Sequence, residues 1–273
     1  MAIIGIVSAL KSEAAVFSAI NRPDRIQNGL AAHRYKNTAW FFNTVLRILT
    51  VNQHAKLLPG HSCQISDNLI LHISGIGADR AYNASQGLIK KGVSILISWG
   101  CAGALLPGIS PGDLILPELI ITRDKTITAN IKWHTHLYST LKKHLNINTG
   151  ALVQHKSILA TPRDKRSLAS KYNAVAVDME SGAIAEAACL ANIPFVAIRA
   201  ISDTADMTIP LSATEAADAS GQIRTMHLFI KVLKNPVDIP RLFRLALTFN
   251  AAKDTLKKVL SLTNWTDPQK PLS

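Results

Sequence analysis

Residues 175–206, VAVDMESGAIAEAACLANIPFVAIRAISDTAD, contain two short apolar runs that each end in acidic side chains. Asp178 and Glu180 follow the run AVAV, and Asp203 follows the run FVAIRAI. Short runs rich in Val and Ile are typical of strands that are buried on both faces of a sheet. The small residues between the runs predict a helix over 181–191. The stretch therefore predicts a strand, a helix and a second strand, with carboxylates at both strand ends.

The same pattern extends along the chain and predicts an α/β fold around a mixed, largely parallel sheet. Ligands of such sheets bind beyond the carboxyl ends of the strands. The further elements that the sequence predicts are strands at 3–7, 69–73, 95–98 and 114–116 and a helix at 78–90.

Two parts of the chain depart from this pattern. The segment that opens with NRPDRIQNGLAAHRY is polar and rich in turn residues, and the apolar stretch after it fits no standard α/β unit. We therefore predict a catalytic domain over 1–230 with an insertion at about 21–65. The remainder, 231–273, is predicted to be a basic helical extension.

The composition indicates a folded protein that remains inside the cell. The chain has 273 residues, of which 48% are hydrophobic, enough for one large core. Its three cysteines show no paired spacing, which is typical of reduced thiols in the cytoplasm. The apolar N-terminus lacks a preceding basic residue, so a buried strand is expected there and not a secretory signal. No apolar run is long enough to predict a membrane span.

Two glycine-rich segments follow predicted strands. SGIGADRA, at 74–81, lacks the third glycine of a dinucleotide fingerprint, so a tight turn close to a ligand is expected. In WGCAGALLPGISPGDLILPE, at 99–118, Gly100 and Gly103 are expected to form a turn that exposes backbone to a planar ligand. Cys101 is a nucleophile candidate, but the sequence identifies no His partner for it.

The segment WHTH, at 133–136, raises the question of a metal site. On a strand the two histidines would share a face, but no nearby Asp or Glu completes a ligand set. We interpret them as solvated histidines, and we expect no metal and no cofactor.

Three carboxylates stand out because each follows a predicted strand: Glu13, Glu180 and Asp203. Taken singly, Glu180 suits a helix N-terminus, and Asp203 with Ser202 suits a turn cap. Three acids at one edge of a sheet repel each other, however, and are typical of a site that uses them.

These motifs resemble the purine and uridine phosphorylase superfamily, in the branch that contains the methylthioadenosine/S-adenosylhomocysteine nucleosidases. The matching blocks are GIVSALKSEAAVF, SGIG, GCAGALLPGISPGDLILPE, VDMESGAIAEAA and IPFVAIRAISDTAD. They cover 1–20 and about 69–230, but not 21–65. The resemblance implies a nucleoside-phosphorylase-like three-layer fold. Within the superfamily, ISDTADMTIP and the C-terminal segment are similar to the hopanoid-associated phosphorylases, which implies release of adenine from adenosylhopane.

The resemblance also implies a role for each site residue. Asp203 would protonate the purine as it leaves, Glu180 would bind the ribose hydroxyls, and Glu13 would activate the attacking water. These three are the predicted catalytic residues. The predicted substrate-binding residues are Met179, Ser202, Cys101, Ala102, Gly103 and Ile158.

Water is the predicted nucleophile. Phosphorylases of the superfamily hold phosphate with an arginine and a serine on the second glycine-rich segment, where this chain has Ser98 and Cys101. Glu13 would moreover repel a bound phosphate. The alternatives are a phosphate-dependent purine nucleoside phosphorylase, a methylthioadenosine- or futalosine-type nucleosidase, and a nucleoside-binding or membrane-associated module without activity.

The net charge of +12 bears on the expected partners. Aromatic residues are too scarce for stacking on bases, so we expect no nucleic acid partner. Apolar and basic residues alternate at helical spacing over 239–262, which fits either a helix packed on its own domain or a helix on anionic lipid. The apolar segment 39–51 is a second candidate for membrane contact. We expect a cytoplasmic homo-oligomer whose substrate is a nucleoside, and peripheral contact with anionic membrane is a hypothesis linked to a lipid-linked nucleoside.

Overall fold

The computed structural model describes residues 2–19, 58–210, 238–263 and 265. Most of the predicted insertion and the segment 39–51 lie outside these residues. The described part of the insertion ends in a strand, β2 (His61–Ser66), that pairs with the main sheet.

The described residues form an 11-stranded sheet in the order β2-β3-β1-β4-β10-β9-β6-β7, with β11 beside β4, β5 beside β11 and β8 beside β5. Parallel pairs dominate its centre, where β1 and β11 flank β4 on either side. Antiparallel pairs occur at β10–β4, β11–β5, β2–β3 and β6–β7. The other strands are β1 (Ile4–Ser8), β3 (Leu69–Ile73), β4 (Ile95–Ala104), β5 (Leu114–Ile115), β6 (Leu119–Ile121), β7 (Thr126–Thr128), β8 (Ile147–Asn148), β9 (Leu152–Gln154), β10 (Ala176–Asp178) and β11 (Phe195–Asp203).

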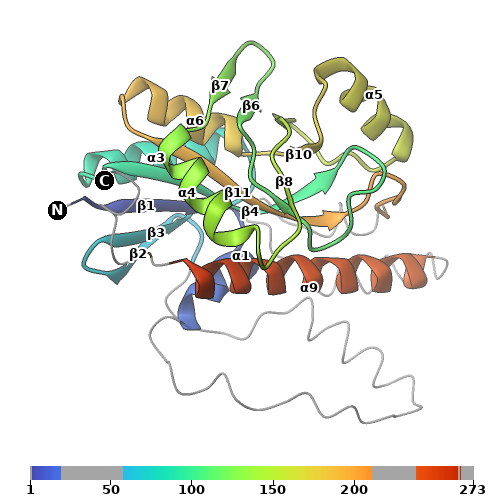
Figure 1. Ribbon diagram of the computed structural model, residues 1–273, viewed down its shortest axis with the longest axis horizontal. Coiled ribbons are helices and arrows are strands. Elements are labelled where there is room, and N and C mark those ends of the chain that lie inside the picture. The colour runs from blue at the N-terminus through green and yellow to red at the C-terminus, as the bar shows by residue number, and fades with distance from the viewer. Residues whose placement is uncertain (1, 20–57, 211–237, 264, 266–273) are drawn as a thin grey trace, which may run out of the picture.

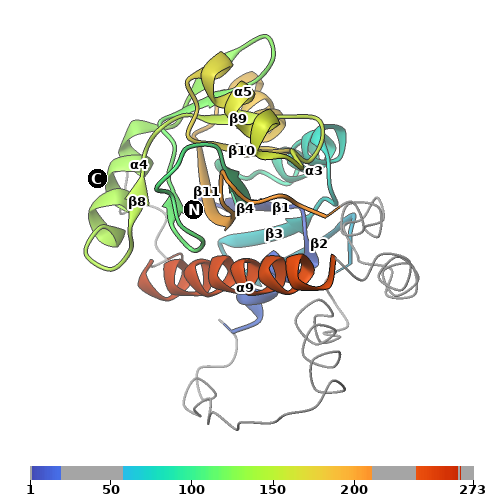
Figure 2. The same ribbon diagram turned by 90° about the vertical axis from the view of Figure 1, so that its right-hand side faces the viewer.

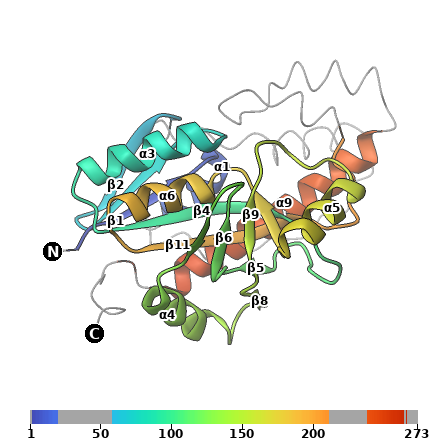
Figure 3. The same ribbon diagram turned by 90° about the horizontal axis from the view of Figure 1, so that it is seen from above.

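Helices cover both faces of this sheet, which confirms the predicted three-layer α/β fold (Figures 1 and 2). On one face α3 (Ala78–Lys90) packs beside α6 (Ser181–Leu190), as seen from above in Figure 3. On the opposite face α9 (Ile239–Leu262) runs along β11 and contacts η1 (Ala15–Ala19). The remaining helices are α1 (Lys11–Ala14), α4 (Ile131–Leu141) and α5 (Pro162–Tyr172).

Local sequence explains where the two peripheral helices begin. Asn130 caps α4 by accepting a hydrogen bond from the backbone N–H of Trp133. Thr161 caps α5 in the same way, and Pro162 occupies the first helical turn, where its missing N–H is not needed. α5 ends at Asn173, whose φ of 48° is the left-handed conformation typical of helix ends.

The structure corrects two predictions. Gly100 and Gly103 do not form a turn after a strand over 95–98, because β4 continues through both to Ala104. The segment WHTH lies on helix α4, which Asn130 caps, and the prediction that its histidines are solvated is wrong for His134. His134 is buried and not solvated: its Nε2 lies 2.9 Å from the carbonyl oxygen of Leu116.

The apolar face of α9 is buried in the core, which is one of the two arrangements that its sequence allowed. Leu256 and Val259 are completely buried, whereas Leu247 on the same helix is 49% exposed. The structure thus joins the C-terminal extension to the catalytic domain as part of the same core.

We predict that Leu256→Ala lowers the free energy of unfolding by about 2–5 kcal/mol, because it removes buried contacts and leaves a cavity. Leu247→Ala is the matched control and should change the free energy by no more than about 0.5 kcal/mol. Denaturant titration of both variants measures the difference. Equal effects would show that α9 does not pack as described.

Candidate active site

A cavity lies beyond the carboxyl ends of β1, β4, β10 and β11. Strand ends of a largely parallel sheet meet there, which is the usual place for a ligand in such folds. Among the residues that line it are all nine site residues predicted from the sequence: Glu13, Cys101, Ala102, Gly103, Ile158, Met179, Glu180, Ser202 and Asp203. Their proximity is thus a property of the fold, while their roles remain predictions.

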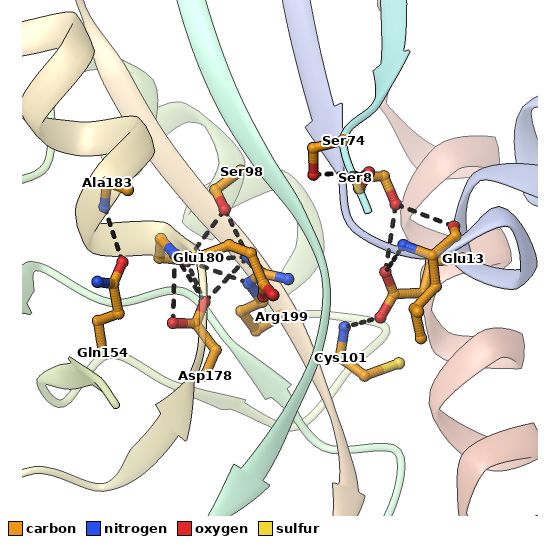
Figure 4. A network of polar contacts seen from close by, with 12 residues as sticks. Ser8, Glu13, Ser74, Ser98, Cys101, Gln154, Asp178, Glu180, Ala183 and Arg199 are labelled. Carbon is orange, nitrogen blue, oxygen red and sulfur yellow. Dashed lines mark hydrogen bonds and ion pairs between the residues drawn. The ribbon is translucent and has the colours of Figure 1, made fainter. Parts of the chain in front are cut away.

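Glu13 lines the cavity, and three hydrogen-bond donors hold its carboxylate (Figure 4). Its Oε1 accepts from the backbone N–H of Cys101 at 2.9 Å. Its Oε2 accepts from the hydroxyl of Ser8 at 3.2 Å and from the backbone N–H of Leu10 at 3.1 Å. Burial raises the pKa of Glu13, although nearby Arg199 and these hydrogen bonds oppose the rise. Glu13 therefore takes up a proton more readily than an exposed glutamate.

Glu180 occupies the N-cap position of α6, at the helix N-terminus where the sequence suggested that it would lie. Its side chain does not cap its own helix. Instead, Oε1 accepts a hydrogen bond from the backbone N–H of Gly77, the last residue of SGIG, at 2.8 Å. Gly77 has a φ of 108°, a conformation that side chains rarely adopt, so glycine suits this turn. Burial and, after it, the charge of Asp178 raise the pKa of Glu180 to about 7.

A buried ion pair lies directly behind Glu180 (Figure 4). Arg199 Nη2 lies 2.9 Å from Asp178 Oδ2, and both side chains are 1% exposed. Arg199 also donates hydrogen bonds to the hydroxyls of Ser98 and Ser181. Ser98 is thus bound to the Arg199 network and is not among the residues that line the cavity.

Asp203 lines the cavity beside Gly103 of β4, and both of its carboxylate oxygens accept hydrogen bonds. Oδ1 accepts from the hydroxyl of Ser202 at 2.9 Å. Oδ2 accepts from the ammonium group of Lys165 at 2.5 Å, and Lys165 is itself completely buried.

The two glycines of β4 make room for these charges. A Cβ atom on Gly100 would clash with Arg199 Nη1, the atom nearest to it, and would lie 2.8 Å from Glu13 Oε2. One on Gly103 would lie 2.8 Å from Asp203 Oδ2. Real Cβ atoms do not approach other atoms so closely. β4 therefore carries glycine at the two positions where charged side chains lie against the strand.

Three residues that shape the site were not predicted from the sequence. Arg199 had a visible signal, because it is the one charged residue in the apolar run FVAIRAI. Asp178 was noted at its strand end but received no role. Lys165 had no signal, because it is one of several charged residues in PRDKRSLASKY.

Cys101 holds Glu13 through its backbone N–H, and its thiol is not suited to act as a nucleophile. Burial and the charge of Glu13 raise the pKa of the Cys101 thiol well above its usual range. A thiol that holds its proton is a poor nucleophile. Within the described ranges, no group of three or more His, Cys, Asp or Glu side chains could hold a metal ion.

The family of the chain follows from a comparison with known proteins. Residues 4–233 match the family model of the phosphorylase superfamily. The chain belongs to the phosphorylase superfamily. It is therefore an enzyme of the superfamily that contains nucleosidases and nucleoside phosphorylases, as the resemblance of its sequence motifs implied.

The relatives of the chain include two bacterial nucleosidases. The chain is 29% identical over 187 residues to the 5'-methylthioadenosine/S-adenosylhomocysteine nucleosidase of Staphylococcus epidermidis, covering 60% of this chain and 82% of the relative. It is 30% identical over 158 residues to the enzyme of that name from Baumannia cicadellinicola, covering 50% of this chain and 69% of the relative.

Solved structures show the same fold. The Helicobacter pylori 5'-methylthioadenosine/S-adenosylhomocysteine nucleosidase with 5'-methylthioadenosine in its active site has a TM-score of 0.59 at 16% identity, over 96% of this chain and 99% of that one. The futalosine hydrolase of Helicobacter pylori has a TM-score of 0.59 at 17% identity, over 95% and 97%. At such identities the likeness concerns the fold alone.

The pKa of Glu180 gives a prediction about stability. Because this pKa is raised from 4.5 to about 7, the folded chain holds a proton between these values that the unfolded chain has released. The free energy of unfolding therefore falls as the pH rises through this window. Glu180→Gln removes this dependence. Relative to the wild type, we expect the variant to gain on the order of 3 kcal/mol between pH 4 and pH 8.

Chemical denaturation at both pH values measures this gain. Glu118→Gln, a change of an exposed glutamate, is the matched control and should show a much smaller pH dependence. If the two variants behaved alike, the environment of Glu180 would not be the one described.

Proposed function

We propose that the protein cleaves the N-glycosidic bond of a purine nucleoside, releasing adenine, with water as the nucleophile. The single observation that supports this best is that Glu13, Glu180 and Asp203 line one cavity, with Glu13 beside Gly100 of β4 and Asp203 beside Gly103. Glu13 and Glu180 form what we call the ribose end, and Asp203 with Ser202 forms the base end. Breaking the bond leaves positive charge on the sugar and negative charge on the base, and the two ends match these charges.

At the ribose end, the carboxylates would act on the sugar and on water. Glu180 Oε1 is held by Gly77, and no described residue donates a hydrogen bond to Oε2, which leaves this oxygen for the ribose hydroxyls. Glu13 would take the proton of the attacking water, a task that its raised pKa favours. The backbone N–H of Cys101 keeps Glu13 in place for that step.

At the base end, Asp203 would bind the purine and pass a proton to a ring nitrogen. Adenine leaves poorly as an anion, so this proton contributes strongly to the rate. Gly103 lets the carboxylate lie close to β4, and the hydroxyl of Ser202 orients Oδ1.

The charges around the cavity favour water over phosphate. Of the described residues that line it, Lys165 is the one with a positive charge, and Asp203 binds its ammonium group. A phosphate would instead meet the carboxylates Glu13 and Glu180. Ser98 occupies a position where phosphorylases of the superfamily hold phosphate. In this chain its hydroxyl instead accepts a hydrogen bond from Arg199.

We predict that Asp203→Asn lowers the rate of base release by about 10²–10⁴, because the variant cannot pass a proton to the purine. Asp206→Asn is the matched control: Asp206 is exposed and lies three residues further along the chain. Chromatography of the released base measures both rates. A folded Asp203→Asn protein with the parent's rate would exclude the proposed role.

We predict that base release needs no phosphate and yields a free reducing sugar. Incubation with a panel of purine nucleosides, with and without phosphate, tests this directly. A rate that rises in proportion to phosphate concentration, with a sugar phosphate as product, would assign the protein to the phosphorylases.

We further propose a lipid-linked adenine nucleoside, of the adenosylhopane kind, as the substrate. The sequence resemblance of the C-terminal segment motivates this, and the apolar side chains of Ile158, Ile209 and Phe249 on the cavity wall suit an apolar substituent. Peripheral contact with anionic membrane would follow. Because the apolar face of α9 is buried, such contact would involve its exposed basic residues. No helix of the described residues has the length and apolar character of a membrane span.

We predict that the protein floats with anionic vesicles at low salt and is released as the salt concentration rises, since basic side chains would mediate the contact. Flotation with neutral vesicles is the control. Equal failure to float with both kinds of vesicle would exclude membrane binding and leave the nucleosidase proposal intact.

A further inference from the structure

Lys165 stands out as a buried cation with an unusual set of partners. It projects from α5 toward the base end, where it is completely buried. Its Nζ lies 2.5 Å from Asp203 Oδ2, 2.7 Å from the carbonyl oxygen of Thr204 and 3.4 Å from that of Met207. All three acceptors come from the end of β11 and the segment just after it.

This count of acceptors matches an ammonium group, which has three N–H donors. It also matches the form of the pair in which one proton has moved from Nζ to Asp203 Oδ2. The neutral amine then keeps two N–H donors for the two carbonyls, and its lone pair accepts a hydrogen bond from the protonated carboxyl. The surroundings of Lys165 therefore satisfy both positions of the proton within the pair without moving a backbone atom.

An isolated carboxyl group would be a poor proton donor for the reaction. In water, aspartic acid loses its proton at about pH 4, whereas lysine keeps its proton to about pH 10. The Nζ of Lys165 instead places an N–H proton between itself and Asp203 Oδ2, so the pair carries a proton that a carboxylate alone lacks.

We propose that Lys165 acts through Asp203 as a positioning residue: it holds the carboxylate over Gly103 and keeps in the pair the proton that the leaving base receives. This inference rests on the proposed function and adds to it the source of the proton.

The step balances as follows. The bond between C1′ of the ribose and the base nitrogen breaks, and its electron pair goes to the base. The oxygen of the attacking water bonds to C1′, and the proton that this water loses goes to Glu13. One proton passes from the Lys165–Asp203 pair to a ring nitrogen of the base. The pair is left as a carboxylate and a neutral amine, and it regains a proton from water after the base departs.

The test compares two leaving groups. Adenine needs a proton in order to leave, whereas nitrophenolate departs without one. For Lys165→Met, we expect the rate for the adenine nucleoside that the wild type cleaves fastest to fall by about 10²–10⁴. Cleavage of 4-nitrophenyl β-ribofuranoside should change by less than about threefold, since proton transfer does not limit it.

Lys171→Met is the matched control, because Lys171 is an exposed lysine on the same helix. It should affect neither substrate. If Lys165→Met lowered both rates equally, Lys165 would have a purely structural role. If it left nucleoside cleavage unchanged, the inference would likewise be wrong.

A double variant keeps the test decisive if the unpaired Asp203 prevents Lys165→Met from folding. Lys165→Met combined with Asp203→Asn contains neither charge. If Lys165 acts only through Asp203, the double variant should cleave the nucleoside at the rate of Asp203→Asn alone. A further loss of tenfold or more would show that Lys165 acts by another route.

Failure of the proposed function would look different from failure of this inference. A wild-type protein that releases no base from any nucleoside would overturn the proposed function. A wild-type protein that is active, with a Lys165→Met variant of equal activity, would overturn only the role of Lys165.

Discussion

The site depends on how the protein compensates for carboxylates that are removed from water. Burying an unpaired charge costs several kcal/mol, so each buried acid needs a partner, hydrogen bonds or a proton. Two buried cations are available to the buried acids of the site, which are Glu13, Asp178, Glu180 and Asp203. Arg199 forms an ion pair with Asp178, and Lys165 forms one with Asp203. Glu13 and Glu180 are left with backbone and hydroxyl donors, and the pKa of each is raised.

This unequal compensation gives the two ends of the cavity different chemical characters. The base end is organised around an ion pair, so its carboxylate is fixed in direction by Lys165 and Ser202. The ribose end is organised around hydrogen bonds to acids that hold protons more readily. The proposed reaction, whose transition state has a positive sugar and a negative base, would require such an asymmetry, because one end would accept a proton from water while the other gave one to the base.

The sequence contains enough information to predict the fold and the three acids, for a physical reason. Apolar runs define buried strands, and a carboxylate directly after such a run, like Asp203, must lie at the sheet edge. Gly100 and Gly103 misled the prediction because glycine usually weakens a strand. Their true role depends on Glu13 and Asp203, which approach β4 from distant parts of the chain. The histidines of WHTH were predicted to be solvated because the helix cap at Asn130, which sets the face that His134 buries, was not considered.

Lys165 could not have been found in this way. Its helix carries charged residues on most sides, and only the tertiary structure shows that one of them points inward. Arg199 is the opposite case. An arginine within FVAIRAI must be buried, and a buried arginine requires an anion, so its pair with Asp178 was within reach of sequence reasoning.

The position of α9 has a consequence for how the enzyme comes into being. The helix follows every described strand in the sequence, yet it covers one face of the sheet and supplies Phe249 to the cavity wall. During synthesis the ribosome therefore exposes the apolar undersides of β4 and β11 well before the segment that shields them has emerged. A nascent chain at that stage has its acids but neither a finished core nor the part of the cavity wall that Phe249 forms. We expect chaperones to recognise this intermediate, and the cavity to be complete only after α9 has docked.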